Sequence, residues 1–106
     1  MGKLFAITCT GKSEKSFLDL RFGMCTNLVI FNSSSNQYSI IENPFKDEEH
    51  SGVQLIGFLK ALGVTSIITG EVGPKVTDKL VKEKIQLILL QEDKIRVNEI
   101  MDRINR

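Results

Sequence analysis

The stretch SGVQLIGFLKALGVTSIITGEVGP, residues 51–74, decides the fold. Its first half carries apolar residues at helical spacing, namely Leu55, Ile56, Leu59 and Leu62. This spacing predicts a helix that Ser51 caps and Gly63 ends. A β-branched run at 65–69 then predicts a strand, and Pro74 suits the first position of a second helix. Helix, strand and helix in succession are typical of an α/β sheet with parallel strands.

Strand patterns flank this stretch on both sides, over residues 3–10, 27–32, 37–42 and 86–90. A serine-rich turn joins the second and third of these as a hairpin. Asp93 is placed to cap a last helix whose core side holds Val97, Ile100, Met101 and Ile104. The order is β-β-β-α-β-α-β-α, so we expect an α/β fold with a five-stranded mixed sheet flanked by helices.

Length and composition indicate one soluble domain over residues 1–106. With 106 residues, two separate cores would each be too small to be stable. The chain is 42% hydrophobic and 25% charged, which is typical of globular proteins. A net charge of +1 argues against a nucleic-acid binder. Since no apolar run can span a bilayer and no export signal is recognisable, we expect a cytoplasmic protein with no membrane partner and with two reduced cysteines.

A binding crevice is expected at the carboxyl ends of the parallel strands. Three segments converge there in this topology: the long loop at 10–25, the polar loop at 43–52 and the turn at 70–74. Gly70 and Gly73 would let a ligand approach the backbone, and the helix start at Pro74 favours an anion. The same turn is equally compatible with a tight strand-to-helix connection. Arg21 could add positive charge to the crevice, or be simply solvated.

Three residues could act as soft or imidazole ligands: Cys9, Cys25 and His50. Their spacing matches neither a zinc finger nor a four-cysteine iron–sulfur site, so we expect no permanently held metal. A preassembled cluster that brings its own sulfides needs only one or two protein ligands. Each residue also has a plainer interpretation, because cysteines are common in cores and a histidine beside glutamates is usually solvated.

Hydrolytic chemistry has little support in the sequence. The first strand carries no carboxylate, and Glu42 and Glu71 are the only acidic residues near suitable strand ends. His50 is the only histidine and has no evident nucleophile partner. A divalent-metal hydrolase that uses the two glutamates therefore ranks last among the functions considered.

Five motifs resemble those of the dinitrogenase iron–molybdenum cofactor biosynthesis family, the NifX-like and NafY-like cofactor carriers. They are Arg21-Phe22-Gly23, Glu42-Asn43-Pro44, Gly52-Val53-Gln54, the run at 59–64, and Gly70-Glu71-Val72-Gly73-Pro74. The similarity spans residues 3 to about 90. It implies a ribonuclease H-like fold without nuclease chemistry, in a protein that binds iron–sulfur or molybdenum-containing clusters; some relatives hold a molybdenum–copper sulfide cluster.

The resemblance also implies a cofactor-binding histidine, which can only be His50 here, and Cys25 stands where a small residue follows Arg-Phe-Gly-x. The loop at 46–49 is acidic where relatives are glycine-rich. We therefore expect a non-enzymatic carrier of an iron–sulfur or iron–molybdenum type cluster, partnered by cluster donor or acceptor proteins. The metal ligands would be Cys25 and His50, with Cys9, Arg21, Gly70, Gly73 and Pro74 completing the site. The alternative is an interaction or regulatory module that kept the fold without the ligand.

Overall fold

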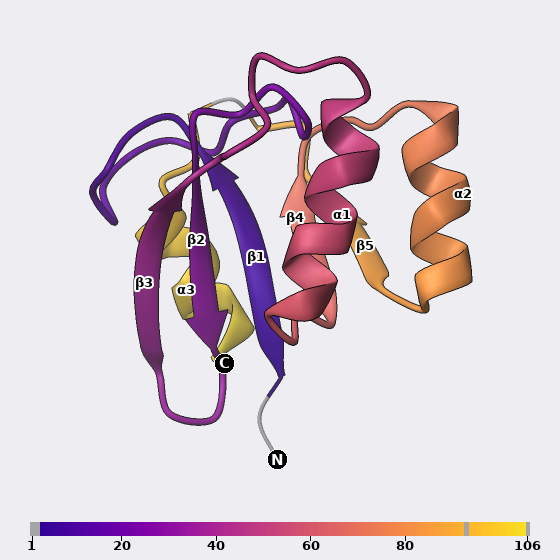
Figure 1. Ribbon diagram of the computed structural model, residues 1–106. Coiled ribbons are helices and arrows are strands. Elements are labelled where there is room, and N and C mark those ends of the chain that lie inside the picture. Colours follow the sequence, from indigo (N-terminus) through magenta and orange to yellow (C-terminus); the bar gives the residue numbers. More distant parts are fainter. Residues whose placement is uncertain (1–2, 93, 106) are drawn as a thin grey trace.

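The computed structural model describes residues 3–92 and 94–105 and contains five strands and three helices (Figure 1). The strands are β1 (Leu4–Cys9), β2 (Asn27–Asn32), β3 (Gln37–Glu42), β4 (Ser66–Thr69) and β5 (Gln86–Leu89). The helices are α1 (Ser51–Ala61), α2 (Pro74–Glu83) and α3 (Val97–Ile104). The predicted element order is confirmed, and β2 and β3 have the predicted bounds.

All five strands form one sheet in the order β3-β2-β1-β4-β5. The β1–β2 and β2–β3 pairs are antiparallel, whereas β1–β4 and β4–β5 are parallel. The predicted mixed sheet is therefore confirmed. Parallel neighbours in a sheet need a crossover connection. Helix α1 immediately precedes β4 and helix α2 immediately precedes β5, and both helices lie on the same face of the sheet.

Helices cover the sheet from both sides. Helices α1 and α2 pack on one face, where Leu55, Leu59 and Leu80 are buried. Helix α3 packs on the other face through Val97, Ile100 and Met101, which confirms its predicted core side. No helix among residues 3–92 and 94–105 has the length and apolar character needed to cross a membrane.

Helix ends differ from the prediction in two places. The N-cap of α1 is His50, in the left-handed conformation at φ 57°, so the prediction that Ser51 caps this helix is wrong. Asp93 lies outside the described residues, and the N-cap of α3 is Arg96, whose amide donates to Glu99 Oε1 at 3.3 Å. Gly63 ends α1 with φ 92°, as predicted.

The long connection between β1 and β2 is fastened to the sheet at several points. Leu18 bridges Cys9, Phe17 bridges Arg96, and Arg21 bridges Glu71. In addition, the Leu18 amide donates to Ile95 O at 2.9 Å. These contacts hold the segment around Arg21 against the carboxyl end of β4, where the crevice was expected.

Candidate functional site

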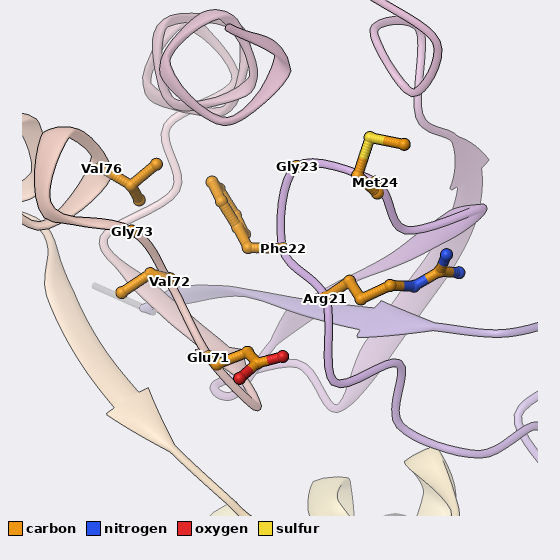
Figure 2. Close-up of a pocket in the computed structure, with 8 residues that line it drawn as sticks. All are labelled: Arg21, Phe22, Gly23, Met24, Glu71, Val72, Gly73 and Val76. Atoms are coloured by element: carbon orange, nitrogen blue, oxygen red, sulfur yellow. The ribbon is translucent and has the colours of Figure 1, made fainter.

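A pocket of about 330 Å³ lies where the turn at 21–24 meets the start of α2, and we call it the α2 pocket. Its wall combines two charged side chains, two glycines and four apolar side chains: Arg21, Phe22, Gly23, Met24, Glu71, Val72, Gly73 and Val76. Figure 2 shows the Phe22 ring projecting from the turn toward Val76, while the Arg21 guanidinium points away from Gly73. The loop after β1 and the turn at 70–74 therefore meet at one pocket, as the topology predicted.

The start of α2 offers unpaired backbone amides to this pocket. Gly73 is the N-cap, Pro74 follows it, and no side chain accepts a hydrogen bond from the first turn. The Thr77 amide is the first to bond within the helix, to Gly73 O at 3.1 Å, so those of Lys75 and Val76 have no intrahelical acceptor. A Cβ atom at Gly73 would meet nothing within 4 Å. A ligand can thus approach the end of the helix that favours anions.

The start of α1 lies against the same turn. A Cβ atom at Gly23 would come within 2.6 Å of both the Gly52 amide nitrogen and Ser51 Oγ, and one at Gly52 would come within 2.6 Å of Val76. Ser51 Oγ also lies 3.9 Å from the sulfur of Met24. The first residues of α1 and α2 therefore lie close together at the turn, and α1 has no side-chain N-cap bond either, so the positive ends of two helix dipoles meet there.

Arg21 is oriented by a buried carboxylate. Its Nε and one terminal nitrogen each donate to Asp19, both at 3.1 Å, and the Asp19 carboxylate raises the pKa of the guanidinium above its ordinary value. Asp19 is 4% exposed, and its carbonyl accepts from Thr8 Oγ1 at 2.6 Å. Thr8 Oγ1 in turn accepts a hydrogen bond from the Thr69 hydroxyl at 2.9 Å across the β1–β4 pair, since its own proton is given to Asp19. The sheet therefore fixes the segment that carries Arg21.

Gly70 has a packing role. A Cβ atom there would lie 2.5 Å from Cα of Leu20, so the residue must be glycine for β4 to approach the preceding loop. The Glu71 amide completes this contact by donating to Leu20 O at 2.8 Å. Gly70 does not line the α2 pocket, so its ligand role stays a prediction, whereas Gly73 lines the pocket and has open space at its Cβ position.

The structure does not bring the Cys25 thiol into the α2 pocket. Its side chain is fully buried in the core cluster with Phe22 and Leu55, and Asn43 Nδ2 lies 3.7 Å from the sulfur. Burial, with smaller contributions from Asp19 and Cys9, raises the pKa of this thiol to about 12. A protonated thiol is a poor metal ligand, because the thiolate is the ligating form.

Cys9 also points into the core, on the α3 side of the sheet. It is fully buried, its sulfur donates to Gly11 O at 3.2 Å, and burial raises its pKa to about 11. The two cysteines belong to different core clusters, which matches the plainer interpretation that the sequence left open for Cys9. Neither thiol lines the α2 pocket.

His50 is exposed and immediately precedes the contact between Ser51 and the turn at 21–24. It is one of three described non-glycine residues with positive φ, a conformation that costs roughly 1–2 kcal/mol. The sulfur that does line the pocket belongs to Met24, which is 50% exposed. His50 is thus adjacent in the chain to a residue that contacts the turn at 21–24 but does not itself line the pocket, whereas a thioether that the sequence reasoning did not consider does.

The two glutamates considered for hydrolysis do not share a site. Glu71 lines the α2 pocket, whereas Glu42 lines a second pocket of about 400 Å³ and pairs with Lys12 at 3.1 Å. Within the described part of the chain, no three His, Cys, Asp or Glu side chains are grouped so as to hold a metal ion. The arrangement expected of a two-glutamate metal site is therefore not formed.

Asn43 is an organising residue that the sequence reasoning missed. It is 6% exposed, and its Nδ2 donates to the carbonyls of Gly23 and Cys25 at 2.9 and 3.0 Å. Its Oδ1 accepts from the Phe45 amide. This side chain holds the turn at 21–24 in place. The Asn-Pro pair was a visible signal for a turn, but the partner segment lies about twenty residues away and leaves no local pattern.

Comparison with known proteins agrees with this architecture. A family model described as "Dinitrogenase iron-molybdenum cofactor" matches residues 3–106. The apo form of the orange protein from Desulfovibrio gigas superposes with a TM-score of 0.87 at 22% identity, covering 97% of this chain and 87% of that one. A NifB-like protein of the DUF35 family from Thermotoga gives a TM-score of 0.79 at 23% identity, covering 94% and 84%. At such identities these likenesses establish the fold alone. Among curated proteins, none matches the sequence.

Proposed function

The chain belongs to the dinitrogenase iron-molybdenum cofactor family, and on that premise we propose that it is a non-enzymatic carrier of an anionic metal–sulfur cluster. The cluster, of iron–sulfur or iron–molybdenum type, would be held in the α2 pocket. The observation that carries the proposal is the uncapped start of α2, where Gly73 leaves open space before two amides without an intrahelical acceptor. Such a helix start attracts negative charge without any side chain.

The apolar part of the wall supports a sulfide-bearing anion over a strongly hydrated one. Phe22, Val72 and Val76 surround the space in front of the helix start. Sulfide ligands are large, polarisable and weak hydrogen-bond acceptors, so they tolerate contact with hydrocarbon. A phosphate would lose more hydration energy against the same side chains. The pocket thus combines electrostatic attraction at one end with an apolar surface at the other.

The residues that line the α2 pocket favour reversible binding of the cluster. Both thiols are buried and have raised pKa values, so the structure favours a preassembled cluster that is held by amides, charge and packing. Direct ligation by Cys25 or Cys9 stays a prediction and would require either thiol to leave the core. Ligation by His50, an exposed residue beside Ser51, likewise stays a prediction. A cargo held without thiolate bonds can be received from a donor protein and passed to an acceptor.

The titratable side chains that line the α2 pocket are Arg21 and Glu71. Asp19 offsets the charge of Arg21, whose guanidinium points away from Gly73, and Glu71 opposes an anion, so attraction for an anion comes from the start of α2. This pair is poorly arranged for general acid–base or nucleophilic chemistry, both of which need a nucleophile and a base within hydrogen-bond reach. The wall therefore supports binding rather than turnover.

Anaerobic titration with tetrathiomolybdate, followed by its visible absorption, tests the proposal. We expect saturable one-to-one binding, weakened by Gly73→Asp and reduced by His50→Ala. Cys25→Ser separates the two ligation schemes, because it leaves binding unchanged if the thiol stays in the core. Gly57→Ala is the matched control, since Gly57 is an exposed glycine of α1 with equally free space around its Cβ position. Absence of uptake, or uptake that ignores Gly73→Asp and His50→Ala alike, would refute the carrier function.

A further inference from the structure

Strand β3 is an edge of the sheet, with β2 on one side only. Among the described residues, no other segment forms a backbone bridge to it. Its six residues, Gln37–Glu42, are all exposed or half-buried. The outer row of peptide groups along β3 is therefore open to another strand.

The ladder pattern identifies which peptide groups face outward. The Asn43 amide donates to Thr26 O at 3.1 Å, in register with the β2–β3 pairing. In an antiparallel pair, hydrogen-bonded and non-bonded positions alternate, so the odd-numbered residues of β3 bond to β2. The amides and carbonyls of Tyr38, Ile40 and Glu42 consequently point away from the sheet.

β3 lacks the features that usually protect an edge. It contains no proline, no lysine and no bulge, and it pairs with β2 without interruption over six residues. The opposite edge, β5, has four residues and is thus a shorter template. An edge as long and regular as β3 is a ready site for strand addition.

The sheet surface next to this edge is also partly uncovered. Helix α1 lies on the β1 and β4 side of the sheet and does not extend over β3 (Figure 1). A shallow groove of about 270 Å³ runs there past Leu4, Ile30 and Ser39. Ile40 and Ile41, on opposite faces of β3, are each only half-buried. A strand added at the edge would cover apolar surface on both faces.

We propose that β3 pairs antiparallel with β3 of a second copy of this chain, about a two-fold axis that passes beside Ile40. In this register Ile40 lies opposite Ile40 of the other copy, and Tyr38 lies opposite Glu42. All members of these pairs have outward peptide groups, so three hydrogen-bonded pairs form. The ten strands of the two sheets then make one continuous sheet.

Charge and shape favour a second copy as the occupant. Glu42, the only charged residue of β3, pairs with Lys12 at 3.1 Å, and the Tyr38 hydroxyl donates to Glu14 Oε2 at 2.8 Å. The proposed register places the Lys12–Glu42 pair of one copy opposite the Tyr38–Glu14 pair of the other, which brings a lysine of each copy toward a carboxylate of its partner. The two Ile40 side chains meet on the α3 side, and each Ile41 meets a serine on the α1 side. A two-fold axis uses the same patch on both chains, as most small homodimers do.

Amide hydrogen exchange of the wild-type chain, measured by NMR between about 10 µM and about 1 mM, is the direct test. Exchange of the Tyr38, Ile40 and Glu42 amides should slow with rising concentration, by about tenfold once about nine-tenths of the chains are paired. The amides of Ser39 and Ile41 are already bonded to β2 in the monomer, so their exchange should start slower and change less with concentration. A chain that stays monomeric by sedimentation over this range, or protection that does not alternate along β3, overturns the proposal.

A charge variant adds a second, independent measurement. Ile40→Lys places two ammonium groups opposite each other at the axis and should abolish association, whereas Gln37→Lys makes a similar charge change at the exposed end of β3. Sedimentation of both, with thermal unfolding to confirm that each is folded, should give a monomer for the first and a dimer for the second. Equal association of the two variants would contradict the register.

Discussion

Replacing Gly73 by aspartate would place a fixed carboxylate where we propose that the cargo binds. The backbone of Gly73 has φ −83° and ψ 169°, the extended conformation that N-cap aspartates adopt, and its Cβ position has no neighbour within 4 Å. The substitution should therefore fit without strain. Its carboxylate would accept a hydrogen bond from the first turn of α2 and interact favourably with the helix dipole.

Two opposite effects follow from this one change. Capping and the dipole together should raise the free energy of unfolding by about 0.5 kcal/mol, which corresponds to roughly 2–4 °C in Tm for a domain of this size. Repulsion between the carboxylate and an anionic cluster lies between about 1 and about 4 kcal/mol at 4 Å, depending on the local dielectric. We therefore expect tetrathiomolybdate affinity to fall about 10- to 100-fold in a protein that has become more stable.

Gly73→Asn is the matched control. Asparagine has the same shape and is an equally good N-cap, but it carries no charge. Calorimetry and absorption titration of both variants should show similar stabilisation, with a much larger loss of affinity for aspartate. Equal binding by the two variants would refute the electrostatic reasoning, and unchanged binding in both would exclude the start of α2 as the site.

Three further predictions use other parts of the structure. Glu71→Gln should strengthen tetrathiomolybdate binding about 2- to 5-fold, because it removes a like charge from the pocket wall; weaker binding in the same titration would contradict this. The pKa values of Cys9 and Cys25, about 11 and about 12, lie above their ordinary value of 9.0, so the folded state retains protons that the unfolded chain releases. The contribution of the two thiols to the free energy of unfolding is fully present below about pH 9 and is lost as the pH rises toward 12, by up to about 1.4 kcal/mol per pH unit for each thiol. Denaturant titrations at a series of pH values should show this slope, and a shallower one for Cys25→Ala. Finally, Gly23→Ala should destabilise the fold by about 1–3 kcal/mol, because its methyl group would collide with the backbone of Gly52. Gly57→Ala, which meets no neighbour, should instead stabilise α1 by up to about 1 kcal/mol. Equal Tm values for the two variants would contradict the packing described.

Local patterns predicted the sheet and helices well because each depends on nearby residues. The serine-rich turn between β2 and β3 and the Asn-Pro pair after β3 indicated where these strands end, and Pro74 and Gly63 marked helix ends through their own backbone preferences. The cap of α1 could not be predicted in this way. Packing of Gly23 against Ser51 and Gly52 involves a distant segment, and it leaves His50 at the N-cap in a left-handed conformation.

The sequence predicted where the α2 pocket forms more accurately than which side chains line it. Topology indicated that the loop after β1 and the turn at 70–74 would meet, and they do. Which side chains face the space depends on hydrogen bonds between segments far apart in the sequence. Asn43 holds the backbone around Cys25, whose thiol lies in the core, while Met24 lines the pocket. No spacing in the sequence distinguishes these two neighbours.

The most direct test of the carrier function is an NMR titration of the backbone amides with tetrathiomolybdate under anaerobic conditions. We expect saturable shifts that are largest for Gly73, Lys75 and Val76, with smaller shifts for the turn at 21–24 and the start of α1. Shifts centred on the second pocket, around Lys12 and Lys46, or no saturable shift at all, would contradict it.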